Sequence, residues 1–85
     1  MSEFSFVEEL ITSQLSDAKV FVEDMTGTRD HLAITVVSDA FKGKLLIEQH
    51  QMLMDILKEE LKSRIHAVKL QTLTHQKFQQ MEQEK

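Results

Sequence analysis

Hydrophobic positions near the start of the chain repeat with the period of a helix. Val7, Leu10, Ile11 and Leu15 fall on one face of a 3.6-residue repeat, which predicts a helix over about residues 4–15. Ser5 and Glu8 have the spacing of a capping box, so we expect Ser5 to cap this helix.

The next two segments change to the period of a strand. Residues 18–24 (AKVFVED) alternate and contain β-branched and aromatic side chains, and residues 31–38 (HLAITVVS) form a second such run. The loop at 25–30 is short, so the two strands are expected to pair antiparallel. Phe21 is then expected to point away from the face that Val20 and Val22 share.

The second half of the chain contains the strongest helical pattern. Residues 45–61 carry a broad apolar stripe, after a turn region at 38–44 with space for one helical turn. The stripe consists of Leu46, Ile47, Leu53, Met54, Ile56, Leu57 and Leu61. Residues 65–72 predict a third strand, and Thr74 a cap for a last helix in which Phe78 and Met81 are the apolar contacts. The polar residues 79–85 are expected to fray.

A strand, a helical crossover and a further strand favour parallel pairing, because a short hairpin cannot make that return. We therefore predict an α+β two-layer sandwich of order αββααβα, with a mixed three-stranded sheet and its helices on one face. Its 85 residues form a single domain over 1–85, with a core at about 4–78 and a polar tail.

Composition narrows the classes of function. The net charge is −4, and residues 1–17 hold four acidic and no basic side chains. The chain has no cysteine, which excludes a thiolate site of its own. It has no apolar run near the ~20 residues of a membrane span, no secretory leader pattern and no catalytic motif. We expect a non-enzyme of the cytoplasm without a membrane partner.

Two histidines open the predicted second and third strands. Parallel strands begin at one edge of a sheet, so His31 and His66 are expected to lie near each other. In a chain without cysteine, a pair of neutral imidazoles is the best available soft-metal site. Strand parity places the two on opposite faces, so one must lie outside regular strand geometry for both to reach one metal.

The same segments carry a family resemblance. Residues 31–38, Phe41-Lys42-Gly43-Lys44, His50, Glu59-Glu60-Leu61, Ile65-His66-Ala67 and Thr72-Leu73-Thr74 occur in the order and spacing of the BolA-like family. The resemblance covers about residues 18–78. It implies a variant of the type II KH fold and two lines of function.

The first implied function is iron–sulfur cluster trafficking. The resemblance implies an adaptor that shares a [2Fe-2S] cluster with a monothiol glutaredoxin and its glutathione, and binds none alone. His66 matches the family's favoured cluster ligand, and His31 matches the second candidate. The chain is then expected to be a monomer alone and a heterodimer with its partner.

The second implied function is transcription regulation linked to stress and cell morphology. Its DNA contacts would come from Lys42, Lys44, Lys62 and Arg64 on the KH-like surface. The family often has Arg-His-Arg in the long helix, where this chain has Gln49-His50-Gln51, and the loss of both cations weakens a DNA contact there.

The remaining features have simpler interpretations. His50 falls within the apolar stripe and is expected to be a buried, hydrogen-bonded histidine, whereas His75 is expected to be exposed in a first helical turn. The family's last helix commonly opens Thr-Pro and carries Trp, and Thr74-His75 with Phe78 is here a packing variation. A third alternative is a protein-binding module that uses the strand face around Phe21.

Overall fold

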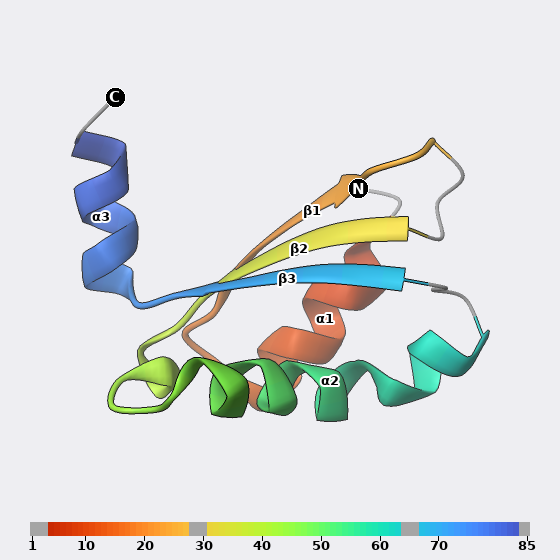
Figure 1. Cartoon of the computed structure of the whole chain (residues 1–85), viewed down its shortest axis with the longest axis horizontal. Helices are drawn as coiled ribbons and strands as arrows, with labels where there is room; N and C mark the ends of the chain where they lie inside the picture. The colour runs from red at the N-terminus through yellow and green to blue at the C-terminus, as the bar shows by residue number, and fades with distance from the viewer. Residues whose placement is uncertain (1–3, 28–30, 64–66, 84–85) are drawn as a thin grey trace.

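The alternating and helical patterns produce the predicted order of elements. The computed structural model describes residues 4–27, 31–63 and 67–83. These residues form α1 (Ser5–Gln14), β1 (Lys19–Asp24), β2 (His31–Val37), the 3₁₀ turn η1 (Asp39–Phe41), α2 (Leu46–Ser63), β3 (Ala67–Leu73) and α3 (His75–Gln83) (Figure 1).

The sheet is mixed, as its connections require. β2 lies in the centre and pairs antiparallel with β1, from Lys19 opposite Val37 to Asp24 opposite Leu32. It pairs parallel with β3, from His31 opposite Ala67 to Val37 opposite Leu73. The α2 crossover is the connection that a parallel pair needs, so the predicted topology is confirmed.

The core lies between the sheet and two of the helices. Leu32, Ile34 and Val36 alternate along β2 and are buried against Leu53 and Leu57 of α2. Val7 and Ile11 of α1 complete this layer. Burying each such side chain contributes about 1.5–3 kcal/mol, and the strand parity predicted for β2 is confirmed.

The third helix takes a different position. Helices α1 and α2 cover one face of the sheet, whereas α3 lies on the other side, beyond the end of β3 (Figure 1). Its Phe78 ring lies 5.5 Å from the ring of Phe21, which points away from α1 and α2. The prediction of helices on one face therefore holds for α1 and α2, and α3 departs from it because this aromatic contact is available only on the opposite face.

Two features of the helix ends differ from the predictions. The helix α1 begins at Ser5 with Phe4 in the cap position, so Ser5 makes no capping hydrogen bond. The apolar Phe4 and Phe6 pack against the core, and this packing sets the start of the helix. At the other end of the chain, α3 continues to Gln83 through part of the segment that its composition predicts to fray.

The apolar stripe of α2 is only partly buried. Its core contacts run from Met52 onward, while Leu46 and Ile47 in the first turn are 63% and 75% exposed. A helix of 18 residues extends about 27 Å, and a strand of seven residues about 23 Å. The helix is longer than the strand that it covers, so its first turn projects past the core.

Candidate functional site

The first candidate ligand, His31, is held at the start of the central strand. Its carbonyl oxygen accepts a hydrogen bond of 2.9 Å from the backbone N–H of Met25, which continues the β1–β2 ladder. The next residue, Leu32, is fully buried, so His31 lies on the opposite face of the sheet and is half-buried. We call this face, which α1 and α2 leave uncovered, the open face.

The second candidate, His66, lies outside the described residues. The residue that follows it in the sequence, Ala67, begins β3 and is the register partner of His31. The parallel pairing places the start of β3 beside the start of β2, and the position of His66 stays a prediction. His31 lies within regular strand geometry, so the parity condition can be met only through the segment before Ala67.

The other two histidines differ from their predicted environments. His50 is half-buried rather than buried, and its ring makes no hydrogen bond to another described residue. His75 is in the first turn of α3 as predicted, but its side chain is only 28% exposed. Its Nε2 atom lies 3.0 Å from the carbonyl oxygen of Asp17 and 3.4 Å from Oδ2 of the same residue.

His75 belongs to a polar cluster that joins three parts of the chain, and we call Asp17, Ser38, Asp39 and His75 the corner cluster. The buried Ser38 hydroxyl donates a hydrogen bond of 2.7 Å to Oδ1 of Asp17. The Asp39 backbone N–H donates one of 2.8 Å to Oδ2, and the His75 backbone N–H one of 3.3 Å to Oδ1 of Asp39. The Ser38 hydroxyl and then the Asp39 N–H lower the pKa of Asp17.

Residues 42–45 connect η1 to α2, and we call this segment, with its exposed lysines, the KH-like loop. Gly43 has φ +74, a left-handed conformation that glycine adopts without strain, between the exposed Lys42 and Lys44. Lys42 also lies 3.8 Å from a carboxylate oxygen of Asp39. Lys62 is exposed near the end of α2, and Arg64 lies outside the described residues.

Gln49 fixes this loop in place. Its amide nitrogen donates hydrogen bonds to the carbonyl oxygens of Phe41, at 3.2 Å, and Lys44, at 2.9 Å. Its amide oxygen accepts a hydrogen bond from the hydroxyl of Thr72 in β3. Gln49 therefore connects the loop, α2 and β3.

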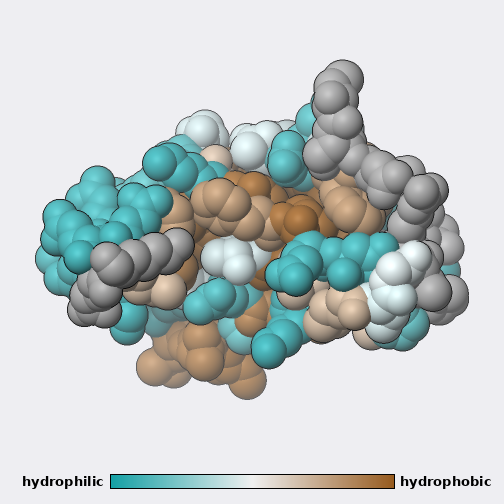
Figure 2. Space-filling model, turned by 90° about the horizontal axis from the view of Figure 1, so that it is seen from above, coloured by the Kyte–Doolittle hydropathy of each residue, from teal (hydrophilic) through white to brown (hydrophobic). Residues whose placement is uncertain are grey.

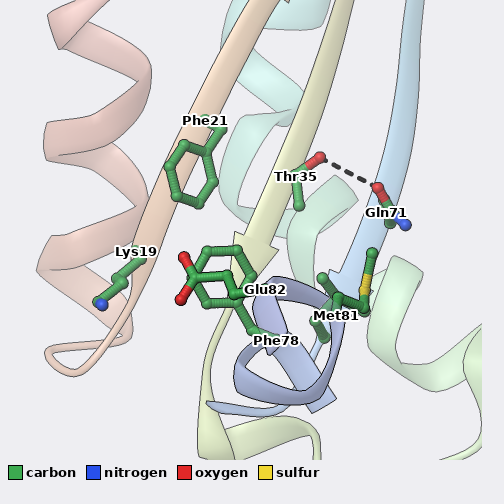
Figure 3. Close-up of a pocket in the computed structure, with 8 residues that line it drawn as sticks. Lys19, Phe21, Thr35, Gln71, Phe78, Met81 and Glu82 are labelled. Carbon is green, nitrogen blue, oxygen red and sulfur yellow. Dashed lines mark hydrogen bonds between the residues drawn. The ribbon is translucent and has the colours of Figure 1, made fainter. Parts of the chain in front are cut away.

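The open face carries a groove that the sequence patterns did not reveal as a cavity. It has a volume of about 600 Å³ and lies between the sheet and α3, with Lys19, Phe21, Gln71, Phe78 and Met81 among its lining residues (Figure 3). Hydrophobic side chains gather over the middle of the molecule in the view from above (Figure 2). The alternation of β1 predicted the face on which Phe21 lies, but not its contact with Phe78, which joins residues 57 positions apart.

Over the described ranges, no group of three or more histidine, aspartate or glutamate side chains has the geometry of a metal site. No helix in the described part of the chain is both long and apolar enough to cross a membrane. Within these ranges the arrangement offers single imidazoles and exposed lysines.

The order of elements and the mixed three-stranded sheet define a small α+β domain of the KH-like type. A family model described as BolA-like protein matches residues 7–77. The chain belongs to the BolA-like family.

Individual relatives agree with this assignment. The DNA-binding transcriptional regulator BolA of Vibrio cholerae is 36% identical over 92% of this chain and 84% of its own length. BolA-like protein 2 of Mus musculus is 33% identical, with 93% of each chain covered. Among solved structures, the BolA domain of SufE1 from Arabidopsis thaliana superimposes with a TM-score of 0.77 at 31% identity, covering 89% of this chain and 95% of that one.

Proposed function

We propose that this chain is an adaptor in iron–sulfur cluster trafficking that shares a [2Fe-2S] cluster with a monothiol glutaredoxin. His66 supplies the principal imidazole ligand and His31 the second candidate. The observation that carries the proposal is the parallel register, in which His31 pairs with Ala67, the residue after His66. Membership of the BolA-like family adds to this support.

The donor set of the chain fits a shared cluster. The chain has no cysteine, so it can contribute imidazole but no thiolate. The thiolates come from the glutaredoxin and from glutathione. Histidine ligation raises the reduction potential of such clusters relative to thiolate ligation alone. Because only neutral imidazole binds the metal, cluster sharing depends on pH.

The test is a titration into cluster-loaded monothiol glutaredoxin, followed by visible absorption and circular dichroism. The wild-type chain is expected to change the cluster spectrum, and His66→Ala to abolish that change. His31→Ala reports whether the second histidine takes part, and His50→Ala is the matched control because His50 lies in α2. If His66→Ala gives the wild-type spectrum, His66 is not a ligand.

A second candidate function is DNA binding through the KH-like loop. It rests on the exposed Lys42 and Lys44 around Gly43 and on the name of the Vibrio relative. Lys62 and Arg64 complete the proposed contact set. Phosphate contacts predict affinity that falls steeply with salt, and a Lys42→Gln/Lys44→Gln variant is expected to bind less tightly with a smaller salt slope. Absence of binding at roughly 50 mM salt would eliminate this candidate.

A further inference from the structure

Within the part of the chain that the structure describes, one edge of β1 has no strand partner. In the described residues the strand order is β1-β2-β3, so β1 is an edge strand (Figure 1). An edge strand presents unpaired N–H and C=O groups that can accept a further strand.

The hydrogen-bond pattern identifies the groups that point outward. The Met25 N–H bonds to the His31 carbonyl, so this pair is a hydrogen-bonded pair of the antiparallel ladder. Such pairs alternate with non-hydrogen-bonded ones. By this alternation Phe21 directs its N–H and C=O toward β2, whereas Val20 and Val22 direct theirs toward the free edge.

The sequence of β1 is symmetric about Phe21, except that the residues two positions away on either side carry opposite charges. It reads Lys19-Val20-Phe21-Val22-Glu23, with a cation and an anion at equal distances from the centre. Lys19, Phe21 and Glu23 lie on the open face and are exposed, Phe21 at 48%. Neither Lys19 nor Glu23 pairs with an opposite charge among the described residues, and the Lys19 ammonium lies 5.6 Å from the Phe78 ring.

We propose that two copies of this chain associate through antiparallel pairing of β1 with β1, with the two-fold axis at Phe21. In this register Lys19 faces Glu23 of the second copy, and Phe21 faces its own equivalent. Both are non-hydrogen-bonded pairs, in which side chains approach most closely. Val20 and Val22 of opposite copies form the hydrogen-bonded pairs with their outward backbone groups. The interface is isologous, as two-fold symmetry requires.

Neighbouring registers are chemically poorer. An axis at Val22 places Glu23 opposite Phe21, and an axis at Val20 places Lys19 opposite Phe21. Each of these registers leaves Lys19 and Glu23 without opposite charges as partners. A shift of the pairing by one residue would place side chains from opposite faces of the sheet opposite each other. Only the register centred on Phe21 satisfies both charges. A self-associating chain differs from the monomer that the sequence predicted. The free edge of β1 lies on the opposite side of β2 from β3, the strand that Ala67 begins.

The experiment is sedimentation analysis of the full chain from roughly 10 µM to 1 mM. This range is high because an interface made of one strand pair is small, and small interfaces bind weakly. Wild type is expected to dimerise, and Lys19→Glu and Glu23→Lys each to weaken dimerisation by roughly tenfold or more, since each reversal creates two like-charge pairs. An equimolar mixture of the two variants restores both opposite-charge pairs and is expected to form the mixed dimer, as is the double variant with itself.

Lys69→Glu is the control, because Lys69 is exposed on β3 and lies outside the proposed interface. Circular dichroism of each variant checks the fold. A wild-type chain that stays monomeric at roughly 1 mM overturns the proposal. So does a dimer that both single variants retain, which would place the contact elsewhere, or a mixture of variants that stays monomeric.

Discussion

Replacing Asp17 by asparagine tests the corner cluster with little change in side-chain size. The carboxylate accepts hydrogen bonds from the Ser38 hydroxyl and the Asp39 N–H through its two oxygens. An asparagine amide keeps one acceptor oxygen, and its NH₂ group presents a donor to the second of these two donors. A hydrogen bond to a charged group is worth about 1.5–3 kcal/mol, and the 44% exposure of the Asp17 side chain reduces this through solvent screening. We expect a loss of about 1 kcal/mol, or roughly 4–8 °C in Tm.

The stability that Asp17 contributes depends on pH in a defined direction. The pKa of Asp17 lies below the ordinary value of 3.8 in the folded chain, first through the Ser38 hydroxyl and then through the Asp39 N–H. The stabilisation is therefore present above the unfolded pKa and is lost as the pH falls through the folded pKa. The difference in unfolding free energy between wild type and Asp17→Asn is thus largest at neutral pH and shrinks below pH 3.8.

Urea denaturation at a series of pH values measures this difference. Glu9→Gln is the matched control, because it removes the same charge from the same acidic segment at an exposed site of α1. The reasoning fails if the two variants lose the same stability at neutral pH. It also fails if the Asp17→Asn difference stays constant as the medium becomes acidic.

Three further predictions follow from the loop and the candidate site. Gln49→Ala removes the hydrogen bonds to the loop and to Thr72 and is expected to cost about 1–2 kcal/mol in urea denaturation, with faster amide exchange at Lys44; unchanged exchange would contradict the proposed connection. Gly43→Ala is expected to cost about 1 kcal/mol from its backbone conformation alone, because an added Cβ meets no atom within 4 Å; a much larger loss would reveal a contact that the structure lacks. Cluster sharing with glutaredoxin is expected to weaken as acidification protonates histidine, measured by visible circular dichroism, and a flat profile from pH ~8 to ~5.5 would argue against imidazole ligation.

Features that depend on the spacing of residues within one segment were predictable from the sequence. The alternation around Leu32 identified the buried face of β2, and Thr74 was identified as a cap, where its hydroxyl accepts the Lys77 N–H at 3.2 Å. The length of the crossover fixed the parallel pairing of β2 and β3. These properties depend on neighbours in the sequence and on connection length.

Features that depend on distant contacts were not predictable. His75 was expected to be exposed because nothing near it in sequence indicates Asp17, which lies 58 positions away. The exposure of Leu46 and Ile47 depends on where the sheet ends beneath α2, and an apolar stripe carries no information about that. For the candidate site, the register supports the approach of the His31 and His66 segments, and ligation itself stays a prediction.

The register of the central strand also has a consequence for folding. Partners in the β1–β2 hairpin are at most 18 positions apart (Lys19 with Val37), whereas every β2–β3 pair joins residues 36 positions apart (His31 with Ala67). Closing the longer loop costs more chain entropy, and contacts of high sequence separation slow folding. We therefore expect the hairpin to form early. The end of the sheet that carries His31 is then completed only when α2 has docked and β3 has paired. A partly folded chain would then lack a finished site, so ligand capture would be coupled to completion of the native state.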